Sequence, residues 1–62
     1  MEGKGKKEQI VEAAMSLILK NGYSHTSVED ITNSIGIAKG SFYTYFKSKN
    51  LLLRTIIEEQ IK

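Results

Sequence analysis

The stretch that decides the fold is VEDITNSIGIAKGSFYTYFK, residues 28–47. Its apolar residues recur at helical spacing on both sides of Gly36, which predicts two short helices joined by a turn of two or three residues. Two such helices lock at a steep angle when apolar side chains stand at the fourth, eighth, tenth, fifteenth and eighteenth positions from Val28. The residues at those positions are Ile31, Ile35, Ile37, Phe42 and Tyr45. The spacing therefore predicts a helix-turn-helix.

Two further positions bear on this prediction. The ninth position needs a backbone with positive φ, which glycine adopts without strain, and Gly36 stands there. At the fifth position the helices nearly touch and alanine or glycine is usual, whereas Thr32 adds a branched hydroxyl side chain. Thr32 is therefore the departure from the pattern.

The second helix of this pair is predicted to have two unlike faces. A projection at about 100° per residue places Ala38, Phe42 and Phe46 toward the core, with Tyr45 beside them. The outward residues are Gly40, Thr44 and Lys47, flanked by Ser41 and Tyr43. This face is small, rich in hydroxyl groups and cationic, and it suits insertion into a major groove lined by phosphates.

Helices are also predicted on either side of residues 28–47. Ile10, Ala14, Leu17 and Ile18 give a first helix from about Lys7 to Asn21, with Gly22 as a left-handed cap. Tyr23 is expected to fold back onto its last turn. Thr26 and Glu29 have the spacing of a capping box for the second helix, over residues 27–35.

A fourth helix is predicted to follow. Ser48 is a good N-cap, and Leu51, Leu52, Ile56, Ile57 and Ile61 continue the helical spacing to the end of the sequence. We thus expect a flexible arm over residues 1–6, a helix-turn-helix domain over 7–47 and the start of a linking helix over 48–62. Lys4, Lys6 and Lys7, at and beside the arm, either reach a minor groove or backbone or stay disordered.

Composition excludes several classes of function. The chain has 62 residues, no cysteine and one histidine, so it allows one domain and no disulfide or thiolate metal site. His25 has no carboxylate or second histidine placed to activate it. We expect no catalytic residue, no metal and no cofactor, and hence no enzyme. No secretory signal or membrane-spanning run is present in the sequence, which predicts a cytoplasmic protein.

Positive charge is concentrated in one part of the chain. The formal net charge is only +2, but residues 37–54 hold no acidic residue and four basic ones, Lys39, Lys47, Lys49 and Arg54. Such a distribution favours a nucleic-acid partner. The alternative is an ordinary solvated surface on a helical module that binds another protein without binding DNA.

The stretch KGSFYTYFKSK, residues 39–49, resembles the signature of the TetR family of bacterial transcription regulators. The resemblance extends to residues 13–14, 22–23, 26–28, 30–31, 36–38 and 51–52, over nearly the whole chain. Departures from the family pattern are Thr32, Ile35, Ala38 and Asn50. The resemblance implies an all-α fold, a three-helix helix-turn-helix bundle like that of homeodomains with the start of a fourth linking helix.

The resemblance also implies a function and its residues. It implies a ligand-responsive repressor that binds operator DNA as a homodimer, through a C-terminal ligand-binding and dimerisation domain that residues 1–62 lack. The fourth helix would transmit effector binding to the DNA-reading head. Lys39 and Gly40 become candidates for reading bases, and the candidates for contacting the DNA backbone are Ser27, Ser41, Tyr43, Thr44, Tyr45 and Lys49.

Overall fold

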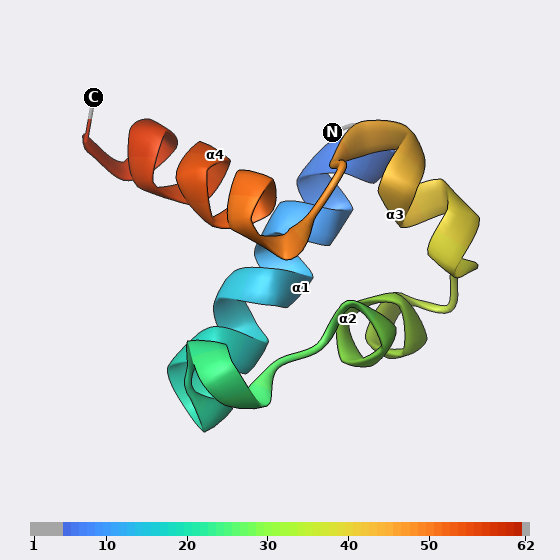
Figure 1. Cartoon of the computed structure of the whole chain (residues 1–62), viewed down its shortest axis with the longest axis horizontal. Helices are drawn as coiled ribbons and strands as arrows, with labels where there is room; N and C mark the ends of the chain where they lie inside the picture. The colour runs from blue at the N-terminus through green and yellow to red at the C-terminus, as the bar shows by residue number, and fades with distance from the viewer. Residues whose placement is uncertain (1–4, 62) are drawn as a thin grey trace.

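The computed structural model describes residues 5–61, and within them the chain is all-helical, as predicted (Figure 1). The elements are α1 (Lys6–Asn21), a single 3-10 turn η1 (Tyr23–His25), α2 (Val28–Ile35), α3 (Lys39–Tyr45) and α4 (Lys49–Ile61). Helix α1 begins one residue before the predicted start. Residues 1–4 of the predicted arm lie outside the described residues.

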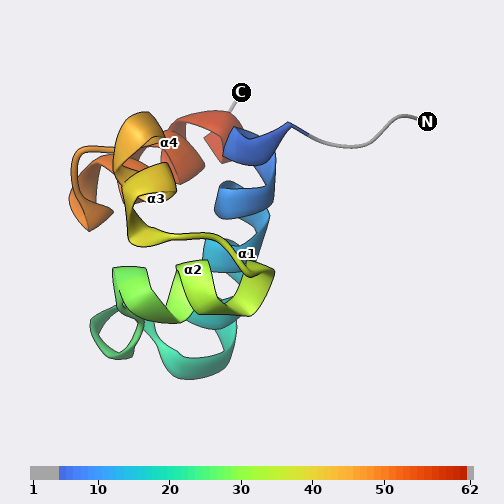
Figure 2. The ribbon, with the colours of Figure 1, turned by 90° about the vertical axis from the view of Figure 1, so that its right-hand side faces the viewer.

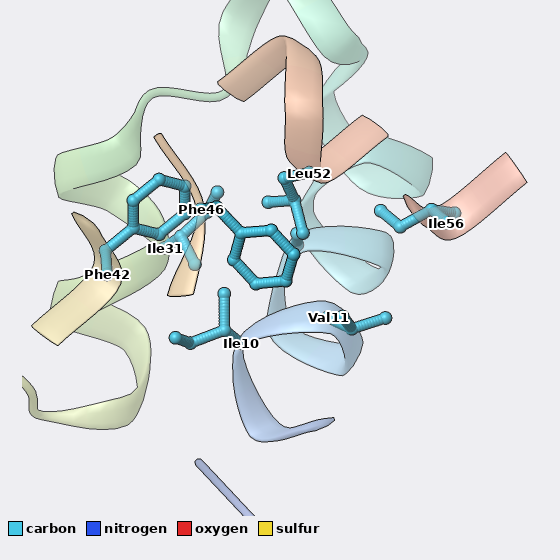
Figure 3. Close-up of a cluster of buried hydrophobic side chains, with 8 residues drawn as sticks. Ile10, Val11, Ile31, Phe42, Phe46, Leu52 and Ile56 are labelled. Carbon is cyan, nitrogen blue, oxygen red and sulfur yellow. The ribbon is translucent and has the colours of Figure 1, made fainter. Parts of the chain in front are cut away.

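One apolar core holds the four helices together. Its buried residues are Ile10, Val11 and Ala14 of α1, Ile31 of α2, Phe42 of α3, Phe46, and Leu52 and Ile56 of α4. Figure 3 shows these side chains converging from all four helices. The rings of Phe42 and Phe46 lie with their centroids 5.8 Å apart. Since burying a side chain of this size contributes about 1.5 to 3 kcal/mol, these two phenylalanines anchor α3 against the rest of the bundle.

The turn between α2 and α3 has the predicted glycine geometry. Gly36 has φ 72° and ψ 35°, in the left-handed region. The N–H of Gly36 donates to the carbonyl of Asn33 at 3.3 Å, and the N–H of Ile37 donates to that of Thr32 at 3.0 Å. These two bonds form a Schellman motif, which ends α2 and redirects the chain into α3.

Thr32 fits the crowded position without an unsatisfied polar atom. It is 2% exposed, and its hydroxyl donates to the Glu29 carbonyl at 3.1 Å. A buried hydroxyl that bonds within its own helix has no unmet hydrogen bond. The helix-turn-helix therefore accommodates this departure.

The predicted capping box at the start of α2 is wrong by one residue. Ser27, not Thr26, is the N-cap: its Oγ accepts from the N–H of Asp30 at 3.0 Å, and its own N–H donates to the Asp30 carboxylate at 3.1 Å. Thr26 is 1% exposed and its hydroxyl donates to the Gly22 carbonyl at 2.9 Å. Burial of Thr26 delays the helix by one residue, which removes Glu29 from the box and leaves it exposed.

The end of α1 also differs from the prediction. Gly22 has positive φ, 90°, but its ψ of 154° lies outside the left-handed helical region. Its N–H still closes the helix by donating to the Ile18 carbonyl at 2.7 Å. The extended ψ sends the chain directly into η1 and away from the helix axis.

Two residues assigned to the core side of α3 lie at the surface. Ala38 is exposed because it is the extended N-cap of α3, with φ −79° and ψ 155°, and so precedes the helix. Tyr45 is 44% exposed. Phe46 leaves the helical conformation, with φ −135° and ψ 123°, and its ring fills the core position beside Phe42. A projection that treated residues 38–46 as one helix could not separate them.

The described part of the chain has no helix of the length and apolar character needed to cross a membrane.

Candidate nucleic-acid interface

Helix α3 lies on the side of the molecule that faces the viewer in Figure 2, and one of its faces is exposed. Lys39, Gly40, Tyr43 and Thr44 are exposed on it, and Ser41 is half-buried. The opposite face is fixed in the core by Phe42, which is 0% exposed. Most of the residues predicted to touch DNA are therefore brought together on one short helix whose inner face is rigidly packed.

The two tyrosines on α3 offer free hydroxyl groups. Tyr43 and Tyr45 are each 44% exposed, and neither hydroxyl has a hydrogen-bond partner among residues 5–61. The Tyr43 ring packs edge-on against Phe42, with centroids 5.3 Å apart and planes at 81°. A ring held in this way carries its hydroxyl outward, where it can donate to a phosphate oxygen.

Lys39 and Gly40 form the N-terminal end of this face. Lys39 is exposed, and no ion pair engages its ammonium within the described residues. A methyl group added at Gly40 would have no atom within 4 Å. The fold therefore does not require a glycine at position 40, although it leaves the backbone there open to a close approach.

Thr44 and Ser27 are partly engaged within the protein. The Thr44 hydroxyl donates to the Gly40 carbonyl at 3.0 Å, so its proton is unavailable to a phosphate while that bond lasts. Ser27 is exposed at the start of α2, where its Oγ accepts from Asp30 and its proton remains free to donate outward.

Lys49 lies in an arrangement that sequence spacing did not indicate. Its Nζ donates to the carbonyls of Thr26 at 2.7 Å and Tyr23 at 3.0 Å, and it lies 4.2 Å from the centroid of the Tyr23 ring. The Tyr23 hydroxyl donates to Asn50 Oδ1 at 2.6 Å. We call Lys49, Asn50, Tyr23 and Thr26 the Lys49 clamp. It attaches the start of α4 to the segment between α1 and α2, and leaves Lys49 one N–H for another partner.

The sequence did not indicate the clamp because its two halves, Tyr23 with Thr26 and Lys49 with Asn50, are more than twenty positions apart in the chain. Local periodicity carries no information on such contacts. The expectation that Tyr23 folds back onto the last turn of α1 did not identify its partners on α4. The only available signal was the aromatic type of Tyr23 beside a helix cap, which does not specify a lysine partner.

Among residues 5–61, no group of histidine, cysteine, aspartate and glutamate side chains could hold a metal ion. The geometry of α3 is instead that of a helix whose outer face carries cationic, phenolic and small residues with free donors. Donors of this kind contact phosphates and base edges in DNA.

Comparison with known proteins agrees with this geometry. The model of the bacterial regulatory proteins of the tetR family matches residues 10–56. The HTH-type transcriptional regulator YerO of Bacillus subtilis is 41% identical over 56 residues, covering 90% of the chain and 19% of the relative. The fatty acid metabolism regulator protein of Bacillus subtilis is 38% identical and covers 86% of the chain and 27% of the relative.

Solved structures show the same fold. A transcriptional regulator from Aquifex aeolicus superposes with a TM-score of 0.88 at 45% identity, over 89% of this chain and 32% of that one. The fatty acid degradation regulator FadR from Bacillus halodurans gives a TM-score of 0.82 at 35% identity, over 95% and 31%. The chain spans about a third or less of these relatives.

The family model covers the helix-turn-helix with the exposed face of α3, most of α1 and the first part of α4. The regulators that match it are transcription factors, not enzymes. The chain belongs to the tetR family of bacterial regulatory proteins and forms its helix-turn-helix DNA-binding domain.

Proposed function

We propose that this domain is the DNA-reading head of a ligand-responsive transcriptional repressor that recognises a specific operator in the bacterial cytoplasm. The observation that carries the proposal is the exposed face of α3. It holds no acidic residue, it begins with Lys39 and Gly40, and Phe42 fixes it on the core. A rigid helix of this kind can enter a major groove as one body.

The residues divide into two roles. Lys39 and Gly40 read bases, because a lysine at the start of a recognition helix reaches guanine acceptors and a glycine lets the backbone come close. The backbone contacts are Ser27, Ser41, Tyr43, Thr44, Tyr45 and Lys49. For Lys49 the free third N–H of the ammonium is the donor, and for Thr44 contact requires its internal bond to open.

Repression is supported by the names of two relatives. One similar protein is the transcriptional repressor DhaR of Mycobacterium, and another is the negative regulator IcaR of the biofilm operon in Staphylococcus aureus. Their lengths exceed that of this chain several-fold, since the chain covers 27% and 28% of them. We propose that a further domain dimerises the protein and binds a small-molecule effector.

The test is a comparison of Lys39→Ala with the wild type on a duplex selected from a random library. Lys39→Ala should alter the preference between this duplex and a scrambled one, because a base contact distinguishes sequences. Discrimination should fall by roughly 1 to 3 kcal/mol, about fivefold to 150-fold. If affinity for both duplexes fell by the same factor, Lys39 would be a backbone contact and its base-reading role would be overturned.

A helical protein-interaction module is the second candidate. An apolar groove of about 310 Å³ lies between α1 and α4, lined by Met15, Ile18, Leu19, Leu53 and Ile56. Leu19 is 84% exposed there. This groove is formed by helices other than α3, so its presence does not compete with DNA binding. Wild-type protein that bound no duplex at low salt would favour this candidate over the first.

A further inference from the structure

A second cationic feature lies outside the residues assigned above. A hollow of about 360 Å³ opens between the first turn of α1, the end of α3 and the outer side of α4. Three basic residues line it, Lys7, Lys47 and Arg54, together with Tyr45, Phe46 and Glu58. We call it the basic hollow. The two views in Figures 1 and 2 place the start of α1 and the end of α3 at the same end of the molecule.

The charges in the basic hollow are not balanced. Arg54 Nε lies 3.8 Å from Glu58 Oε2, and both side chains are at least 70% exposed, so this pair is weak. Lys7 and Lys47 have no carboxylate partner in the described part of the chain. The hollow therefore carries more positive than negative charge, three basic residues against Glu58, and this favours an anionic partner.

Lys7 is held at this place by an aromatic contact. Its Nζ lies 6.0 Å from the centroid of the Phe46 ring, and Phe46 is anchored in the core with 4% exposure. A cation over the face of an aromatic ring is attracted by the ring quadrupole. Lys7 therefore lies against the Phe46 ring where both residues line the hollow.

Tyr45 connects the basic hollow to the proposed DNA face. It is the last residue of α3, its hydroxyl is free, and it also lines the hollow. A DNA strand that contacted Tyr45 at the end of α3 would therefore adjoin the hollow that Lys47 and Lys7 line. The hollow is broad and open, which suits a chain of phosphates running through it more than a single enclosed ion.

We propose that the basic hollow binds the phosphate backbone of DNA that flanks the segment read by α3, with Lys7 and Lys47 as its donors and Arg54 as an auxiliary cation. This inference rests on the proposed DNA-binding function and extends the footprint beyond α3. It assigns a binding role to Lys7, Lys47 and Arg54.

The test measures the salt dependence of binding for the full-length protein. The probes are two duplexes with the same selected core, one with long flanks and one trimmed to the core. On the long duplex, Lys7→Ala and Lys47→Ala should each lower the slope of log K against log salt by about 0.9, and the double variant by about 1.8. The matched control is Lys20→Ala, an exposed lysine in the last turn of α1, which should leave the slope unchanged.

The outcomes separate this inference from the proposed function. On the trimmed duplex the double variant should match the wild type, and Lys47→Arg should keep the wild-type slope on the long one. An unchanged slope for the double variant on the long duplex, with salt-dependent binding by the wild type, overturns the basic hollow and leaves the function intact. A second measurement is an NMR titration of the wild type with inorganic phosphate. If phosphate shifted the Lys47 amide resonance while the double variant kept the wild-type slope on the long duplex, the hollow would bind a free anion and not DNA. No wild-type binding to either duplex overturns the proposed function itself.

Discussion

Gly40 stands on the exposed side of α3 with open space where a methyl group would project. Gly40→Ala should therefore stabilise the free domain by about 0.4 to 1 kcal/mol, because alanine restricts the unfolded chain. The same methyl group would occupy the space into which DNA must fit. We expect thermal unfolding to shift upward while affinity for the selected duplex falls.

Both measurements on the one variant are needed to decide the role of Gly40. Higher stability with unchanged affinity would remove Gly40 from the interface. Lower stability would contradict the helical geometry of its position. Ser16→Ala is a suitable comparison, because it changes an exposed residue of α1 outside the proposed interface without adding an atom.

Lys49 has a structural partner set as well as a proposed phosphate. Lys49→Ala should lower the salt slope of DNA binding by about one unit on all duplex sequences, because a phosphate contact reads no bases. It should also destabilise the domain by about 1 kcal/mol, since the carbonyls of Tyr23 and Thr26 lose a charged donor. Salt titrations and thermal unfolding measure the two effects separately.

Asn50→Ala serves as the uncharged control for Lys49. It removes the acceptor of the Tyr23 hydroxyl and leaves the charge of the clamp in place. Its salt slope should equal that of the wild type. If the salt slope of DNA binding were unchanged in Lys49→Ala as well, Lys49 would stabilise the fold without contacting a phosphate.

At the scale of the helices, the start of α2 gives the clearest test of a cap. Ser27→Ala should cost about 1 kcal/mol, within a range of roughly 0.5 to 2, because the Asp30 N–H loses its acceptor. Glu29→Ala should change stability by less than about 0.5 kcal/mol, since Glu29 is exposed and outside the box. Denaturant titration of both variants compares them, and a larger loss for Glu29→Ala would contradict the observed box.

The sequence around this cap shows where local reasoning reaches its limit. Thr26 with Glu29 and Ser27 with Asp30 both offer a hydroxyl followed three residues later by a carboxylate. The choice depends on Thr26 being buried and bonded to Gly22, which is a tertiary effect. The turn glycine was predictable because Gly36 and the apolar residues around it impose their geometry within a few residues.

The helices show the same difference between features set by local sequence and features set by contacts between distant segments. Apolar spacing predicted the existence of all four helices and the burial of Phe42 and Phe46, since these depend on period alone. It failed for Ala38 and Tyr45, because α3 contains only seven residues and the chain leaves the helix on either side. The charged and phenolic residues of α3 could be predicted as a set, but the partners of Lys49 and the position of Lys7 beside Phe46 depend on contacts between distant segments.

At the scale of the whole molecule, residues 1–62 alone are expected to be a weak DNA binder. The proposed dimerisation domain would lie outside them, and a domain of this size buries only about 60% of the surface of its unfolded chain. We predict a monomer or a weakly associated species in sedimentation and a much lower operator affinity than that of the full-length protein. A tight dimer of residues 1–62 would contradict the placement of the dimer interface.

The Lys49 clamp makes the first turn of α4 and the peptide ahead of α2 a single mechanical unit. The carbonyl held at 2.7 Å belongs to Thr26, the residue immediately before the cap of α2. A tilt of α4 about its own start therefore either breaks three contacts of one ammonium at once or drags the entrance of α2 with it. We therefore expect a displacement of α4 to be transmitted through these contacts to Ser27, the residue that follows Thr26. The clamp links the position of α4 to the start of α2 through the peptide that precedes α2.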